Sequence, residues 1–133
     1  MIKVLVLCTG NSCRSIIAEA LINANLDGFV AKSAGVVPKD EVNPLAKKIL
    51  KEKGIWDERY HPKDIGDVLD EDFDLVITVC DNAKKSCPIF PKKTKKLHIP
   101  FDDPDGKDFS AFEKTYNNIK DILLPKVLDA FSS

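Results

Sequence analysis

The chain lacks the features of a membrane, secreted or nucleic-acid-binding protein. Its 133 residues contain no apolar run of transmembrane length, and the first residues carry no signal-peptide cleavage pattern. Repeats and low-complexity tracts are also absent. The 20 basic and 21 acidic residues give a net charge of −1 at pH 7, which excludes a general attraction to nucleic acid or to a membrane surface. We therefore expect a cytoplasmic, monomeric protein with one domain over residues 1–133.

Cysteine is sparse, with four residues at Cys8, Cys13, Cys80 and Cys87. In the reducing cytoplasm such thiols serve catalysis, redox cycling or metal binding more often than structural cross-linking. A zinc site does not fit, because the spacing of the last two cysteines is too wide for a zinc knuckle and no second pair of cysteines or histidines follows. Catalysis and redox cycling are therefore the roles to consider.

Strand and helix signals alternate along the chain and predict a single-domain α/β fold, with a mainly parallel four-stranded sheet and helices on both faces. Apolar runs predict strands over residues 2–7, 29–33, 75–79 and 96–99. Helices are predicted from Ser15, from the Asn43-Pro44 pair, over a short segment at 64–69, and from a capping box of Ser110 and Glu113. Pro125 is expected to kink or divide the last helix.

The most informative motif connects the first strand to the first helix and reads Cys8-Thr9-Gly10-Asn11-Ser12-Cys13-Arg14-Ser15. Gly10 and Asn11 can adopt the positive φ angles that turn loop N–H groups toward one point. The helix N-terminus and Arg14 add positive charge, so the motif predicts a cradle for a tetrahedral oxyanion. The predicted oxyanion-binding residues are Thr9, Gly10, Asn11, Ser12, Cys13 and Arg14.

Cys8 lies at the base of this cradle and is the predicted nucleophile. The field of the cradle is expected to lower the pKa of its thiol and keep it as a thiolate, with Ser15 donating a hydrogen bond to the sulfur. Cys13 is expected to be a packing residue that points away from the ligand. The alternative interpretation of the motif is a buried cysteine followed by an ordinary turn.

Three reactive residues follow predicted strands: Cys8 after the first, Cys80 after the third and Asp103 after the fourth. In α/β folds, ligands bind beyond the carboxyl ends of the strands. The sequence therefore predicts that these residues lie on one rim of the sheet and form an active site.

The cradle, together with Asp102-Asp103-Pro104, resembles the low-molecular-weight protein tyrosine phosphatase superfamily. The resemblance implies that Asp103 is the general acid that protonates the leaving oxygen, while Pro104 fixes the turn that aims the carboxyl group. Without the cradle, this acidic segment would be interpreted as a polar surface turn.

The segment 79–88 resembles the thioredoxin-coupled arsenate reductases of that superfamily, which carry two resolving cysteines there. The resemblance implies that Cys8 attacks arsenate, for which phosphate and sulfate are analogues. Cys80 then attacks Cys8 and releases arsenite, and Cys87 attacks Cys80 to leave a disulfide for thioredoxin or a similar dithiol. Phosphatases of the superfamily tend to carry tyrosines directly after the Asp-Pro pair, where this chain has Asp105 and Gly106.

Two other functions stay open. A phosphatase acting on phosphotyrosine or a small phosphomonoester would need Cys8, Arg14 and Asp103, with the other two cysteines protecting Cys8 from oxidation. A non-catalytic redox-sensing or oxyanion-binding module is the third possibility. Cys80 considered alone is also typical of a small buried apolar residue at the end of a strand.

The chemistry requires no cofactor. Some arsenate reductases of this family hold a monovalent cation beside the cradle, and Asn11, Glu19, Ser33 and Asp64 resemble its ligands, so potassium is a candidate. Six lysines surround Cys87 in the sequence, and their default interpretation is a solvated face, with anion steering or docking of a redox partner as alternatives. They are Lys84, Lys85, Lys92, Lys93, Lys95 and Lys96.

Overall fold

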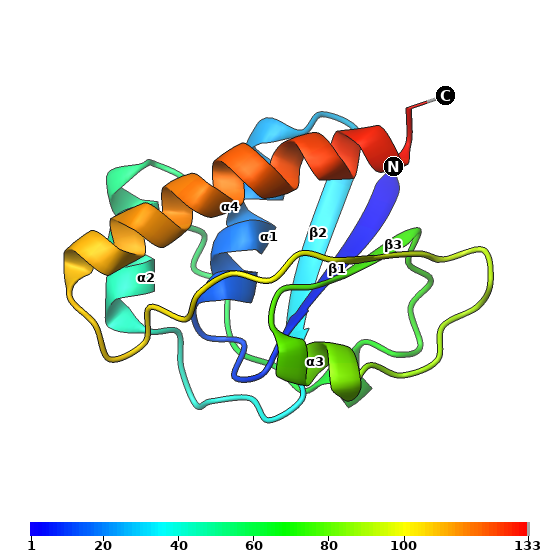
Figure 1. Cartoon of the computed structure of the whole chain (residues 1–133), viewed down its shortest axis with the longest axis horizontal. Helices are drawn as coiled ribbons and strands as arrows, with labels where there is room; N and C mark the ends of the chain where they lie inside the picture. The colour runs from blue at the N-terminus through cyan, green and yellow to red at the C-terminus, as the bar shows by residue number, and fades with distance from the viewer. Residues whose placement is uncertain (133) are drawn as a thin grey trace.

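A computed structural model describes residues 1–132 and has an α/β architecture built on one sheet (Figure 1). The four strands stand in the order β2-β1-β3-β4, and every neighbouring pair is parallel. The strands are β1 (Ile2–Cys8), β2 (Phe29–Gly35), β3 (Leu75–Thr78) and β4 (Lys95–His98). The helices are α1 (Arg14–Asn25), α2 (Pro44–Glu52), α3 (Asp81–Lys85) and α4 (Phe109–Ala130), with a 3₁₀ turn η1 (Ile65–Asp67).

The central strands β1 and β3 are buried on both faces. The side chains of residues 4–7 and 75–77 are at most 1% exposed. Continuous apolar runs of this kind, without alternation, are typical of parallel strands covered on both sides. The predicted parallel four-stranded sheet is therefore confirmed, and its strand order places β1 and β3 side by side.

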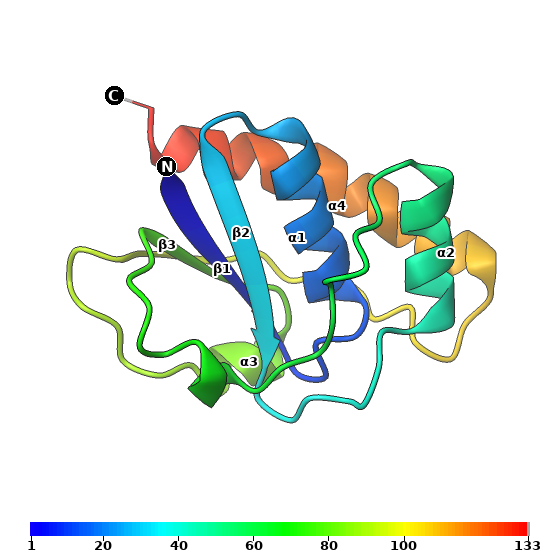
Figure 2. The same cartoon turned by 180° about the vertical axis from the view of Figure 1, so that it is seen from behind.

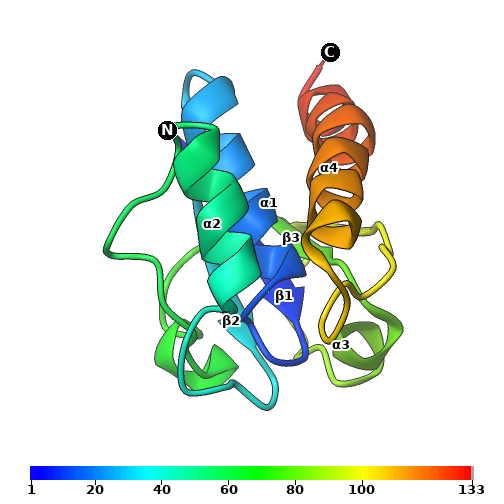
Figure 3. The same ribbon diagram turned by 90° about the vertical axis from the view of Figure 1, so that its left-hand side faces the viewer.

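The helices are unevenly distributed around the sheet. Helices α1, α2 and α4 pack against one another, and α1 lies directly on β1 and β2 (Figure 3). In Figures 1 and 2, α3 lies near the carboxyl ends of the central strands. No helix within residues 1–132 combines the length and the apolar character that crossing a bilayer requires.

Several element ends differ from the predicted ones for local reasons. Strand β2 continues to Gly35, because Gly35 pairs with Cys8 and forms a bridge with Asp64. The helix predicted over 64–69 is only the turn η1, whose first N–H groups are capped by the Asp64 carboxylate. The short helix α3 was not predicted, and the sulfur of Cys80 caps it by accepting from the Ala83 N–H at 3.4 Å.

The predicted capping box of α4 is wrong, and the division expected at Pro125 does not occur. The residue that caps α4 is Asp108, whose carboxylate accepts from the Ala111 N–H at 3.2 Å, while Ser110 lies inside the first turn and donates to the same carboxylate at 2.9 Å. The helix also continues undivided through Pro125. Burial of Leu123 and Val127 on either side offsets the backbone hydrogen bond that the proline removes.

The observed cap makes a prediction about stability. Asp108→Ala should lower the free energy of unfolding, because the first turn of α4 loses its acceptor. Ser110→Ala should cost less than about 0.5 kcal/mol, because this hydroxyl only supports the cap. Urea denaturation of both variants measures the difference. If Ser110→Ala lost more free energy of unfolding than Asp108→Ala, Ser110 would be the capping residue and the observed cap would be contradicted.

Candidate active site

The cradle loop is held from outside by the segment that follows β2. Four carbonyl groups of the loop accept backbone hydrogen bonds of 2.9 to 3.3 Å from residues 36–43. The pairs, acceptor first, are Cys8 with Val36, Thr9 with Val37, Gly10 with Lys39, and Ser12 with Asn43. Because these carbonyls face away from the cavity, the N–H groups of the loop are left to face it. Cys13 caps α1 without a side-chain bond, which leaves the first helical N–H groups open to an anion as well.

Asn11 makes the sharpest turn of the cradle. Within residues 1–132 it is the one non-glycine residue with a positive φ, at 51°. Its buried amide Nδ2 donates to Ser15 Oγ and Ser33 Oγ at 2.8 Å each, and its Oδ1 accepts from the Lys63 N–H at 2.9 Å. These three bonds stabilise a conformation that an L-residue otherwise avoids.

Two expectations about neighbouring residues are not met. Gly10 does not share the positive φ; a Cβ there would approach Lys39 Cγ to 3.2 Å, so close packing is its constraint. Ser15 accepts from Asn11, and among residues 1–132 it forms no hydrogen bond to Cys8. Ser15 therefore supports the shape of the loop rather than the sulfur.

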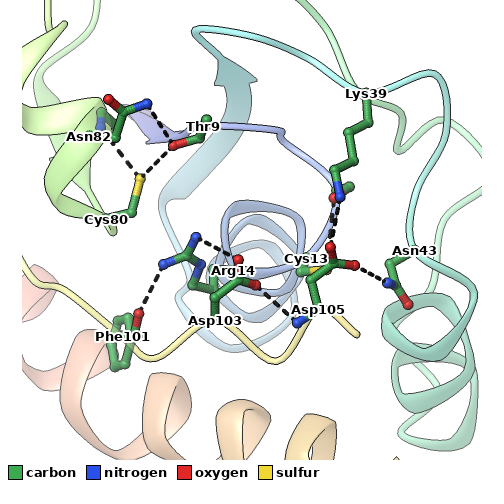
Figure 4. A network of polar contacts seen from close by, with 12 residues as sticks. Thr9, Cys13, Arg14, Lys39, Asn43, Cys80, Asn82, Phe101, Asp103 and Asp105 are labelled. Atoms are coloured by element: carbon green, nitrogen blue, oxygen red, sulfur yellow. Dashed lines mark hydrogen bonds and ion pairs between the residues drawn. The ribbon is translucent and has the colours of Figure 1, made fainter. Parts of the chain in front are cut away.

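Arg14 joins the cradle to Asp103. Its Nη1 donates to the Phe101 carbonyl at 3.0 Å, and its Nη2 lies 3.4 Å from Asp103 Oδ2 (Figure 4). Its Nε is the one buried side-chain nitrogen or oxygen without a hydrogen-bond partner in the part of the chain that the structure describes. A buried donor of this kind is costly unless a ligand accepts from it, and an oxyanion oxygen is such an acceptor.

The cavity above Cys8 has a volume of about 340 Å³ and is lined by the whole cradle, by residues 37–39, and by Asp103 and Asp105. Asp103 is held at its mouth, because its second carboxylate oxygen accepts from the Asp105 N–H at 3.0 Å. Cys8, Arg14 and Asp103 thus line one cavity, as the sequence predicted.

Cys80 comes to the same rim through the pairing of β1 with β3. Leu7 pairs with Thr78 in this register, so β1 ends at Cys8 and the chain reaches Cys80 two residues after β3 ends, at the same edge of the sheet. The Thr9 hydroxyl lies 3.2 Å from Cys80 Sγ and accepts from Asn82 Nδ2 at 3.1 Å. Because Asn82 occupies the oxygen as an acceptor, the hydroxyl hydrogen of Thr9 is free to point at the sulfur (Figure 4).

The two thiols titrate as a pair. Hydrogen bonding to Cys8, supported by Thr9 and the Ala83 N–H, lowers the pKa of Cys80 to about 5. Hydrogen bonding to Cys80 and burial raise the pKa of Cys8, and the charge of Arg14 does not compensate. The pair therefore shares one negative charge at neutral pH. The raised pKa of Cys8 runs against the expectation that the field of the cradle alone lowers it.

The other two cysteines lie apart from this pair. Burial raises the pKa of Cys13 to about 11, so this thiol stays protonated, and Cys13 lines the cavity together with the rest of the cradle. Cys87 is half-buried and lines a different cavity, on the β4 side, together with Leu97 and His98. All four cysteines are free thiols. The structure thus unites Cys8 with Cys80 but leaves Cys87 outside the cradle.

The residues expected to hold potassium do not fit a cation. Ser33 Oγ donates to Glu19 at 2.6 Å, whereas the Asp64 carboxylate caps η1. The ammonium group of Lys63 donates to the Ser33 carbonyl at 2.8 Å and to the His61 carbonyl at 3.1 Å. A positive charge of the chain itself therefore lies beside Ser33, one of the expected ligands, and it opposes binding of a potassium ion there.

Sequence reasoning missed several residues of the site. Asn43 was expected only as the cap of α2, which it is, through a 2.9 Å bond from the Leu45 N–H. Lys39 stands in a loop that carries no motif, and Asn82 lies in the short helix α3, which was not predicted. Gly35 follows the second predicted strand, but its role in the site was not predicted. A Cβ on it would come within 2.7 Å of the Thr9 carbonyl oxygen, so the cradle requires glycine there.

Comparison with known proteins agrees with this geometry. Residues 3–128 match the low molecular weight phosphotyrosine protein phosphatase family. "Arsenate reductase 1" of Staphylococcus epidermidis is 44% identical over 117 residues, which cover 86% of each chain. The solved arsenate reductase of Archaeoglobus fulgidus has a TM-score of 0.80 at 32% identity, covering 93% of this chain and 98% of that one.

Two further solved structures represent both branches of the family. The low molecular weight protein tyrosine phosphatase of T. tengcongensis has a TM-score of 0.83 at 26% identity, covering 98% of this chain and 100% of that one. A thioredoxin-dependent arsenate reductase of Corynebacterium glutamicum has a TM-score of 0.71 at 28% identity, covering 97% of this chain and 63% of that one. The chain belongs to the low molecular weight phosphotyrosine protein phosphatase family.

The thiol pair makes a prediction about titration. The ultraviolet absorbance of thiolates should rise in one step near pH 5 as the pair loses its first proton. Cys80→Ser should abolish this step, because the sulfur that ionises is gone. Cys8→Ser should keep it, because a serine hydroxyl still donates to Cys80. The reverse pattern would place the thiolate on Cys8.

The position of Lys63 makes a prediction about cations. Replacing potassium by sodium or choline at equal ionic strength should change the melting temperature by less than about 1 °C, because a bound ion would otherwise add its binding free energy to stability. Thermal unfolding at increasing salt measures this. A rise specific to potassium would contradict the assignment of Lys63 and restore the cation site.

Proposed function

We propose that this chain reduces arsenate to arsenite by a three-cysteine relay, with thioredoxin or a similar dithiol as the final reductant. The observation that carries the proposal is the hydrogen-bonded Cys80 thiol beside Cys8. Ester hydrolysis at the cradle has no use for a second thiol there, whereas reduction requires one. The relatives named as arsenate reductases support the same conclusion.

In the first step, arsenate enters the cradle with its oxygens toward the loop N–H groups and the Arg14 guanidinium. The anionic sulfur of Cys80 accepts the proton of Cys8 as the pair's charge moves to Cys8, which then attacks arsenic. Asp103 at the mouth is placed to protonate the leaving oxygen, which departs as water. The product is a covalent Cys8–arsenic adduct in which arsenic is still pentavalent.

In the second step, Cys80 loses its proton again and its thiolate attacks the sulfur of Cys8. The sulfur–arsenic bond breaks, and its electron pair stays on arsenic, which leaves as trivalent arsenite. The two sulfurs have supplied the two electrons and form a disulfide. Neighbouring parallel strands lie ~4.8 Å apart, which suits the ~4.4–6.8 Å between α-carbons that a disulfide needs.

In the third step, the Cys87 thiolate attacks the sulfur of Cys80 and frees Cys8. Because Cys87 lines a different cavity, the segment 81–91 has to rearrange for this attack. The bond between Asp81 Oδ1 and His98 Nε2, at 2.8 Å, is one of the contacts that tie α3 to β4 and that such a movement strains. The Cys80–Cys87 disulfide is then available to an external dithiol.

A phosphatase is the second candidate. It is favoured by the placement of Asp103 next to Arg14 at the cradle and by the phosphatases among the solved structures. In that case Cys8 would form a phosphocysteine and water would release phosphate, with no change in oxidation state. Parallel assays of arsenate-dependent dithiol oxidation and of aryl phosphate hydrolysis separate the two functions.

The relay predicts the behaviour of Cys87→Ser. This variant should release about one arsenite per enzyme and then stop, because Cys8 and Cys80 complete the reduction but nothing resolves their disulfide. Peptide mapping should identify a Cys8–Cys80 bond in the stalled enzyme. Hydrolysis of an aryl phosphate under reducing conditions should be unaffected by the change.

Cys8→Ser serves as the control, since it should abolish both activities by removing the attacking sulfur. Sustained, dithiol-dependent turnover of Cys87→Ser at the wild-type rate would show that Cys87 is dispensable and would contradict the relay.

A further inference from the structure

The mouth of the cradle is crossed by an ion pair that joins its two walls. Lys39 comes from the loop between β2 and α2, and Asp105 comes from the loop between β4 and α4. Lys39 Nζ lies 2.8 Å from Asp105 Oδ2, and Asn43 Nδ2 donates to Asp105 Oδ1 at 2.8 Å (Figure 4). We call these two contacts the mouth clamp. They engage both oxygens of one carboxylate from the opposite wall.

The clamp residues are anchored to the cradle. The Asn43 N–H donates to the Ser12 carbonyl, and the Lys39 N–H donates to the Gly10 carbonyl. The aliphatic chain of Lys39 lies over Gly10, close enough that a Cβ there would contact its Cγ at 3.2 Å. The Asp105 N–H donates a hydrogen bond to Asp103 Oδ1. An exposed ion pair usually contributes little, but fixed ends reduce the side-chain entropy that it has to overcome.

The direction of the reaction decides what the clamp can exclude. An attacking sulfur and its leaving group lie in line on opposite sides of the central atom. With Cys8 at the base, the leaving oxygen lies at the mouth, beside Asp103. For a free oxyanion this group is a hydroxyl or water, which is small. For a phosphate ester the organic group has to extend between the two loops, where Lys39 and Asp105 meet.

We propose that the mouth clamp determines specificity by favouring free tetrahedral oxyanions over esters and other anions that carry a bulky substituent. This inference rests on the proposed function, because it selects the small oxyanion that a reductase uses over the esters that a phosphatase uses. The physical cause is that a bulky substituent enters only after the ion pair and the amide bond to Asp105 have opened.

Direct binding of phosphonates to the reduced full-length protein tests the clamp without catalysis. Methylphosphonate and benzylphosphonate carry the same phosphonate group and differ in the size of the substituent. The measured quantity is the ratio of their dissociation constants, benzyl over methyl, by calorimetry. Asp105→Ala should lower this ratio by about fivefold, because opening the clamp no longer opposes the larger group.

A second variant separates size from charge. Lys39→Ala removes a positive charge and Asp105→Ala a negative one, so the affinities for both phosphonates should shift in opposite directions in the two variants. The ratio should nevertheless fall in both. Asp40→Ala is the matched control. Asp40 is an exposed acid next to Lys39, in the loop between β2 and α2, and it forms no ion pair in the described chain. The ratio of dissociation constants in this variant should equal that of the wild type.

An unchanged ratio in both clamp variants, with both proteins folded by circular dichroism, would overturn the inference. A fall in only one of them would also overturn it, because the effect would then follow charge rather than the closed pair. Failure of the wild type to reduce arsenate would instead contradict the proposed function, and it would leave the binding ratios to decide the role of the clamp.

Discussion

The hydrogen bonds between the parallel strands β1 and β3 are the contact on which the site depends. They bring two cysteines that are far apart in the sequence to one edge of the sheet, with Leu7 paired to Thr78 just before them. The strands are buried on both faces, so a slip in register would move apolar side chains to the wrong side of the sheet. The packing of the core therefore fixes how close Cys8 and Cys80 can approach, and with it the chemistry available at the cradle.

A second set of hydrogen bonds determines the shape of the cradle. The segment 36–43 occupies the loop carbonyls, and Asn11 closes the sharp turn through buried bonds. The loop N–H groups, the uncapped start of α1 and the unpaired Arg14 Nε are consequently directed toward a ligand. The same segment supplies Lys39 and Asn43 to the mouth clamp. One stretch of chain thus shapes the anion site and limits the size of what enters it.

Much of this could be predicted from the sequence. Uninterrupted apolar runs identified the buried strands, the spacing from Cys8 to Arg14 identified the cradle, and the rule for ligands in α/β folds placed Cys80 on the same rim. The errors arose where competing local groups decide the outcome. Asp108 rather than Ser110 caps α4, because both offer an oxygen at nearly the same place in the first turn. Pro125 is tolerated because tertiary packing outweighs its propensity.

Other features depend on residues brought together only by the fold. The pKa of Cys8 is raised because Cys80 and burial outweigh Arg14, a balance that no spacing of residues reveals. The Lys63 ammonium lies beside Ser33, one of the expected cation ligands, because its loop crosses the end of β2. The Lys39–Asp105 pair joins two loops that are far apart in the sequence, and no motif links Lys39 to the Asp-Pro segment before Asp105.

The central claim is that Cys80, positioned beside Cys8, makes this cradle a reductase. Cys80→Ser tests it most directly, in a single mixing of reduced enzyme with arsenate and in a parallel assay of aryl phosphate hydrolysis. The account predicts that the variant forms the Cys8–arsenic adduct but releases no arsenite, while any hydrolysis of the ester is unchanged from the wild type. Release of arsenite at the wild-type yield by Cys80→Ser would contradict the account.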